Sequence, residues 1–177
     1  MCSEGLDVSK ATSAPAGGVD TRKVAGRRTL RFGSVEQIMA DVDRLVEAER
    51  AGRLRQVGNW TLGQALGHLA TWAEYSYDGA PVKAPFFIRW AVWLRKRSFL
   101  YGPMRAGIMI PGIEGGTLAS EPMPLDEALG RMRRAMERLK HEAPTAESPI
   151  LGLLRHEEWI ALHSRHAELH LSFLIAD

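Results

Sequence analysis

The stretch Trp159–Leu174, with the sequence WIALHSRHAELHLSFL, decides how this chain folds because it combines a helical apolar pattern with three histidines. At about 100° per residue of an α-helix, His163, His166 and His170 fall within about 60° of one another. They lie among the apolar positions of the helix, and polar side chains such as Glu168 take the opposite face. The imidazoles are therefore expected to face the core, where each ring nitrogen needs a partner.

Two of these histidines have the spacing of a metal chelate. His166 and His170 are separated by four residues, so both side chains can reach one point beside the helix. Neutral imidazoles in this arrangement bind borderline transition metals well. Two ligands do not make a stable site, however, and a third donor is expected from elsewhere in the chain.

Composition limits the classes of protein to consider. The chain has 177 residues, of which 45% are hydrophobic and 25% are charged, so we expect one globular domain with its own core. A net charge of +2 does not indicate a nucleic-acid-binding protein. No apolar run approaches the roughly 20 residues of a membrane span, so a soluble protein is expected. The lone Cys2 fits a reducing cytoplasm.

The domain organisation follows from where periodicity begins. Residues 1–28 are rich in Ser, Gly, Ala, Lys and Thr without periodicity, and are expected to form a flexible N-terminal tail. Arg27-Arg28 superficially resembles an export signal, but the hydrophobic region that such a signal needs does not follow. Residues 29–177 are expected to form a single domain.

Helical spacing of apolar residues predicts four long helices, which cover residues 35–51, 61–78, 125–140 and 159–174. The first two are preceded by capping boxes, SVEQ at 34–37 and TLGQ at 61–64. The third begins after Pro124 with an acidic first turn, which the helix dipole favours.

The second helix offers the third donor. His68 lies beside its apolar arc, on a polar but nearly uncharged face with Gln64 and Trp72, and such a face suits a pocket wall better than solvent. On this helix alone, an exposed histidine is the simpler interpretation. The pair His166 and His170 changes that, because His68 is the only histidine on another strongly helical segment with an uncharged face.

These motifs resemble a known family. The sequence NWTLGQ at 59–64 with His68-Leu69, followed by LHSRHAELHL at 162–171, is similar to the DinB/YfiT-like superfamily of metalloenzymes. The closest likeness is to a branch known only as a domain of unknown function. It runs from about Val19 to the C-terminus and includes the Arg28-x-Leu30-x-Phe32 entry, so it covers nearly the whole domain.

The resemblance implies a four-helix bundle with a metal centre whose ligands are His68, His166 and His170. It assigns no role to His163. This residue either supports a ligand or faces the substrate, or it is a core histidine bonded to a carbonyl; we favour the core histidine. Gln64 lies one turn before His68 on the same face. It is therefore the candidate for orienting that ligand or a metal-bound water.

Three imidazoles without a carboxylate or thiolate suit zinc, nickel or iron(II) rather than magnesium or calcium. Three protein ligands leave a coordination position open, which is the pattern of catalytic sites. The wider superfamily includes thiol-dependent transferases, so a transferase or a hydrolase acting on a small molecule is expected. Ala167 follows His166, and Glu168 points away, so the glutamate of an HExxH metalloprotease is absent.

The segment between the second and third helices is strongly basic. Residues 79–113 contain six basic residues and no acidic one, with aromatic residues interleaved. A helix over residues 86–100 can lie on an anionic membrane or cover the bundle with its cationic ends in water, and we favour the packed helix. Gly and Pro interrupt regular structure in residues 101–124. A lid or binding loop is expected there, and a poorly ordered loop is the alternative.

The predicted architecture is thus an all-α, up-and-down four-helix bundle with a long basic insert between its second and third core helices. The expected partners are a small-molecule substrate, such as an anionic thiol that the insert at 83–105 would hold, and no nucleic acid. The rival is a non-catalytic metal-binding module, or one bound to a membrane surface through residues 86–105. A homodimer is compatible with either. His141 and His156 are expected at the surface.

Overall fold

The computed structural model describes residues 18–108 and 117–177. Its helices are α1 (Val35–Arg50), α2 (Leu62–Asp78), α3 (Phe86–Trp93), α4 (Lys96–Tyr101), α5 (Leu125–His141) and α6 (His156–Leu171). Two short strands, β1 (Leu54–Gln56) and β2 (Leu174–Ala176), form an antiparallel ribbon. The described part of the chain is therefore mostly helical, as the sequence predicts.

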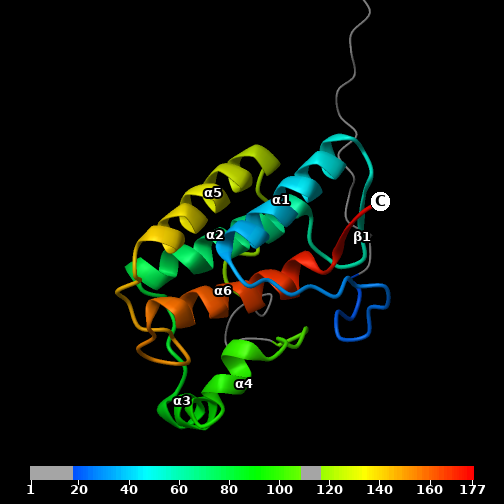
Figure 1. Ribbon diagram of the computed structural model, residues 1–177. Helices are drawn as coiled ribbons and strands as arrows, with labels where there is room; N and C mark the ends of the chain where they lie inside the picture. The colour runs from blue at the N-terminus through cyan, green and yellow to red at the C-terminus, as the bar shows by residue number, and fades with distance from the viewer. Residues whose placement is uncertain (1–17, 109–116) are drawn as a thin grey trace, which may run out of the picture.

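The four long helices lie side by side and share one hydrophobic core (Figure 1). The most extensive helix pairing is between α2 and α5. Each long helix contributes side chains with almost no exposed surface, among them Ile38, Leu45, Leu66, Met132 and Leu171. On α1, α2 and α5 the buried residues are the apolar positions of the predicted helical patterns, so burial of one stripe on each of these helices stabilises the arrangement. Leu171 of α6 lies outside the apolar stripe predicted for that helix.

The predicted helix starts are confirmed at their caps. The Ser34 side chain accepts a hydrogen bond from the amide of Gln37, and Thr61 does the same for Gln64. The Gln64 side chain also accepts from the Thr61 amide, which completes the capping box of α2. Gln37 instead accepts from the amide of Gly33, one residue earlier than a capping box requires.

Helix α6 is enclosed on more than its histidine face. Ser164, Arg165 and Glu168, on the opposite face, are also buried. The chain that leads into α1 covers them, because the Phe32 amide donates to Glu168 Oε1 and Arg165 donates to the Phe32 carbonyl. Arg165 and Glu168 also form an ion pair, at 2.6 Å. The polar face of α6 therefore packs against protein.

The basic pair Arg27-Arg28, which the sequence assigns to the tail, bonds to the helical body. The Arg28 amide donates to the Ser172 carbonyl at 2.9 Å, and its guanidinium pairs with Asp41 at 2.7 Å. The Arg27 guanidinium donates to Ser172 Oγ and lies over the ring of Phe173. The tail prediction for residues 1–17 lies outside the described residues.

The β-ribbon is not predictable from the sequence. Leu54 pairs with Ala176, and Gln56 pairs with Leu174. The last helix was expected to reach Leu174, since apolar residues there keep helical spacing, but it ends at Leu171. The backbone groups of the final residues bond to β1 instead. A strand of three residues has no periodicity that distinguishes it from a helix end.

The basic insert forms two helices where the sequence predicted one. The α-helical path breaks at Leu94-Arg95, and α4 then packs against α6 with Leu100 fully buried. By contrast, α3 has no buried residue. The favoured packed-helix interpretation therefore describes α4 and not α3. None of the helices in the described ranges is long and apolar enough to cross a membrane.

Candidate metal centre

Three histidines from two helices meet where α2 and α6 lie together; His68 is buried, and His166 and His170 are half-buried. His68 comes from α2, and His166 and His170 come from α6. One ring nitrogen of each lies within 4.8 Å of the other two, in a grouping that could hold a metal ion. The closest contact joins His68 Nε2 and His166 Nε2, at 3.0 Å. The structure thus brings together the three residues that the sequence analysis selected as ligands.

The spacing can be compared with what a metal requires. In a tetrahedral site, bonds of about 2.0–2.1 Å from nitrogen to zinc place two ligand nitrogens no more than about 3.4 Å apart. The His68–His166 pair already meets this limit. The three nitrogens lie within 4.8 Å of one another, so the widest separation would have to close by up to about 1.4 Å when a metal binds. The donor set and its geometry therefore fit a transition metal.

A backbone carbonyl fixes the orientation of His68. Its Nδ1 lies 2.8 Å from the Leu118 carbonyl oxygen, which can only accept, so Nδ1 carries the proton. The Nε2 lone pair of His68 then points at Nε2 of His166. Two lone pairs at 3.0 Å repel unless a proton or a cation lies between them. The space between these two nitrogens is therefore a site for a proton or for a cation.

Burial keeps all three imidazoles neutral. Removal from water lowers the pKa of His68 to about 4, against the opposing effect of the carbonyls of Leu118 and Ala119. Burial, reinforced by repulsion between the rings, holds the pKa values of His166 and His170 well below the ordinary value. Metal binding requires unprotonated nitrogens, so near neutral pH few protons would have to be displaced.

Two tryptophans enclose the imidazoles. The Trp60 ring is stacked on His170, with centroids 4.8 Å apart and planes at 6°. Trp60 also contacts His68, and Trp72 lies about 6 Å from both His68 and His166. The sequence analysis missed this role of Trp60, because a tryptophan before a helix has the position of a hydrophobic staple. These rings restrict the histidines and limit their contact with water.

The segment after the undescribed residues lies over α2. The carbonyls of Leu118 and Ser120 accept hydrogen bonds from His68 and Gln64. Gly63 and Gly67 allow this approach, since a Cβ on Gly63 would collide with the Met123 carbonyl. Residues 117–124 of the predicted loop therefore lie over α2 beside His68.

Gln64 is placed differently from the role expected for it. Its Oε1 accepts from the Thr61 amide at 3.0 Å, and its Nε2 donates to the Ser120 carbonyl at 3.1 Å. Both polar ends are thereby occupied, and the group that orients His68 is the Leu118 carbonyl. No side-chain pattern in the sequence could identify a backbone carbonyl that acts across 50 residues.

His163 is a core histidine, as we favoured, but its partner is a hydroxyl. Its Nε2 lies 2.7 Å from Ser76 Oγ, and its ring stacks on Trp159 at 5.7 Å. Both His163 and Ser76 are buried, and burial lowers the pKa of His163 to about 4. It lies one turn from His166 but outside the metal-binding group.

The other histidines lie elsewhere. His141 is exposed and bonds to Glu137, as expected for a surface residue. His156 is half-buried, with Nε2 2.6 Å from the Leu139 carbonyl. Within the described ranges, no carboxylate or thiolate belongs to the metal-binding group.

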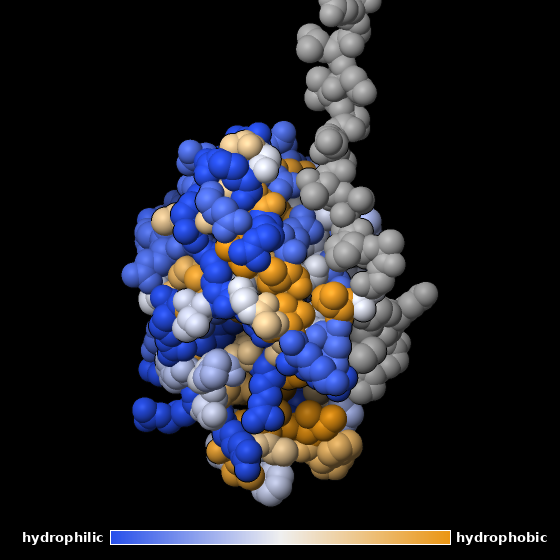
Figure 2. Space-filling model, turned by 90° about the vertical axis from the view of Figure 1, so that its right-hand side faces the viewer, coloured by the Kyte–Doolittle hydropathy of each residue, from blue (hydrophilic) through white to orange (hydrophobic). Residues whose placement is uncertain are grey.

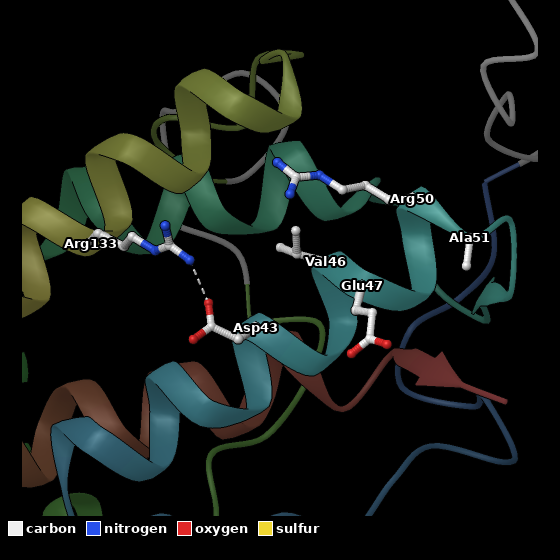
Figure 3. Close-up of a pocket in the computed structure, with 6 residues that line it drawn as sticks. All are labelled: Asp43, Val46, Glu47, Arg50, Ala51 and Arg133. Carbon is white, nitrogen blue, oxygen red and sulfur yellow. Dashed lines mark hydrogen bonds and ion pairs between the residues drawn. The ribbon is translucent and has the colours of Figure 1, made fainter.

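A surface groove lies apart from the histidines, between α1 and α5 (Figure 3). It is lined by Asp43, Val46, Glu47, Arg50, Ala51 and Arg133. Asp43 and Arg133 pair across it at 2.7 Å. The groove contains no histidine and none of the three residues that could hold a metal ion.

Comparison with known proteins shows the family and nothing about its chemistry. No curated protein and no solved structure matches the chain. The family described as a protein of unknown function, DUF1569, matches residues 24–177, and the chain belongs to this family.

Proposed function

We propose that this chain is a metal-dependent enzyme on a DinB-like, up-and-down four-helix bundle, with His68, His166 and His170 as ligands of a divalent transition metal. The observation behind the proposal is the 3.0 Å approach of His68 and His166 from different helices, with His170 beside them. Bundle cores are common hosts for metals held between facing helices. The family match names no activity, so the proposal depends on these residues.

The donor set supports zinc, nickel or iron(II). Imidazole nitrogens suit these ions, whereas magnesium and calcium prefer oxygen ligands. A closed structural zinc site has four protein ligands, but among residues 18–108 and 117–177 the group consists of three histidines. An exchangeable position therefore remains for water or substrate, which favours an enzyme over a non-catalytic metal-binding module.

When bound, such a metal supplies Lewis acidity, which activates a water or a thiol at neutral pH. The chain's own residues prepare the site for it. The Leu118 carbonyl holds the proton of His68 on Nδ1, and Trp60 stacks on His170. We propose a thiol-dependent transferase or a hydrolase acting on a small molecule. The cations of the insert, such as Arg95 and Arg97, would favour an anionic thiol.

Substitution with cobalt(II) tests both the site and the choice of thiol. Chain purified without a histidine tag is freed of metal, loaded with cobalt(II), and titrated with mercaptoethanol and with mercaptosuccinate. A transferase that uses an anionic thiol predicts a thiolate-to-cobalt absorption band at lower concentrations of mercaptosuccinate. A cobalt site that gives no band with either thiol contradicts the transferase and leaves the hydrolase.

A further inference from the structure

The outward face of α3 is apolar, which is the reverse of an ordinary surface helix. Phe86 is 83% exposed, Trp90 is 64% exposed and Trp93 is 59% exposed. At about 100° per residue these three side chains fall within about 60° of one another, with Leu94 and Phe87 beside them. The half-buried Val92 lies on the opposite side, toward the protein. The most exposed part of this helix is thus its aromatic stripe.

The stripe is part of a larger hydrophobic surface. Figure 2 shows hydrophobic residues gathered at the lower end of the molecule, at the height of α3 and α4 in Figure 1. Tyr101, at the end of α4, is 47% exposed. Single exposed apolar residues are common on protein surfaces, but a contiguous group of large aromatic ones marks a surface that binds something.

The segment that carries this surface is basic. Glu147 pairs with Lys83 and Arg89, and Glu158 pairs with Lys96. The insert's other cations are Arg95, Arg97 and Arg105, which are exposed and have no carboxylate within ion-pair distance in the described ranges. The aromatic stripe is therefore followed, in the turn into α4 and beyond it, by exposed arginines with which no described carboxylate pairs.

We propose that α3, with the turn that leads into α4, is an interfacial anchor that binds the protein to an anionic lipid surface. Tryptophan and phenylalanine insert at the boundary between headgroups and acyl chains, and the arginines beside them bind anionic headgroups. A symmetric contact with a second copy would bury the aromatics equally well. It would also bring the uncompensated arginines of both copies together, so the charge favours lipid.

Sedimentation of the full chain with vesicles tests this proposal. We expect binding to phosphatidylcholine vesicles that contain phosphatidylserine, weak binding to phosphatidylcholine alone, and loss of binding at high salt. The double variant Phe86→Ser/Trp90→Ser should bind roughly tenfold more weakly or worse. Since α3 has no buried residue, this variant should keep the wild-type circular dichroism and melting temperature.

The charge component needs a matched control. Arg95→Gln/Arg97→Gln should weaken binding by about fivefold for each charge removed. Arg133→Gln/Arg134→Gln, on α5, removes the same net charge and should have little effect. Equal binding to vesicles with and without phosphatidylserine would overturn the proposal. Equal losses of vesicle binding in Arg95→Gln/Arg97→Gln and in Arg133→Gln/Arg134→Gln would overturn it as well. So would a dimer in solution that Phe86→Ser/Trp90→Ser dissociates, without any vesicle binding.

The anchor does not depend on the metal centre. The variant His68→Ala should bind vesicles as the wild type does, because α3 and the histidine cluster share no residue. The two proposals can therefore fail separately.

Discussion

His68 Nε2 and His166 Nε2 lie 3.0 Å apart although 98 residues separate them in the chain. Because the Leu118 carbonyl holds a proton on His68 Nδ1, the facing Nε2 atom offers a lone pair. A cation between the two rings satisfies both nitrogens at once. The most direct consequences of the structure concern what binds there and what keeps the rings in place.

The stacked tryptophan should report on metal binding. Paramagnetic nickel quenches the emission of a nearby indole, and the Trp60 ring lies 4.8 Å from that of His170. We expect nickel to quench the tryptophan fluorescence of the wild type and Trp60→Phe to lose much of that quenching. Trp93→Phe, on exposed α3, is the matched control and should retain it. Equal quenching in both variants would place the bound nickel away from Trp60.

The glycine at the start of α2 should matter to the site through the loop. A Cβ on Gly63 would meet the Met123 carbonyl, so Gly63→Ala must displace the segment that carries Leu118. We expect a loss of about 1–3 kcal/mol in the free energy of unfolding, together with weaker zinc binding. Gly130→Ala, in the middle of α5, meets only the flexible end of Arg134 at 3.4 Å. That control should be stabilised by about 0.5–1 kcal/mol; urea denaturation measures both.

His163 should contribute to stability and not to metal binding. His163→Ala leaves Ser76 Oγ without its 2.7 Å partner and opens a cavity beside Trp159. We expect the free energy of unfolding to fall by about 2–4 kcal/mol. Zinc affinity should change by no more than the tenfold to hundredfold typical of a residue next to a ligand. A larger change in affinity, in protein shown to be folded, would make His163 a ligand.

The metal-free protein should lose stability on mild acidification. Burial lowers the pKa of His163 to about 4, whereas an unfolded histidine has a pKa of about 6.5. Between these values the unfolded chain binds a proton that the folded chain excludes, so stability falls as the pH drops from about 6.5 toward 4. The loss from this residue approaches about 3 kcal/mol, and His68 acts in the same direction.

Urea denaturation between pH 7 and pH 4.5 measures this effect. His163→Phe keeps a ring in the core and should make the pH dependence shallower by about one proton. His141→Ala removes an exposed histidine and should leave the pH dependence unchanged. A wild-type stability that stays flat over this range would show that the buried histidines do not titrate as described.

The sequence predicted those features that periodicity and capping encode. The four long helices, the caps at Ser34 and Thr61, and the grouping of His68 with His166 and His170 all follow from local spacing or family motifs. Two features were missed: the hydrogen bond from His68 to the Leu118 carbonyl, and the β-ribbon. Both depend on backbone groups that lie far from their partners in the chain. The exposure of α3 corresponds to the alternative that was not favoured, since an amphipathic pattern does not say which face turns outward.

Calorimetric titration of zinc into tag-free, metal-free chain tests the central claim most directly. The account predicts about one zinc per chain and a weakening of at least about a hundredfold in each of His68→Ala, His166→Ala and His170→Ala. His141→Ala, the exposed control, should bind zinc as the wild type does. Unchanged zinc binding in His68→Ala, with the variant shown to be folded, would contradict the three-histidine metal centre.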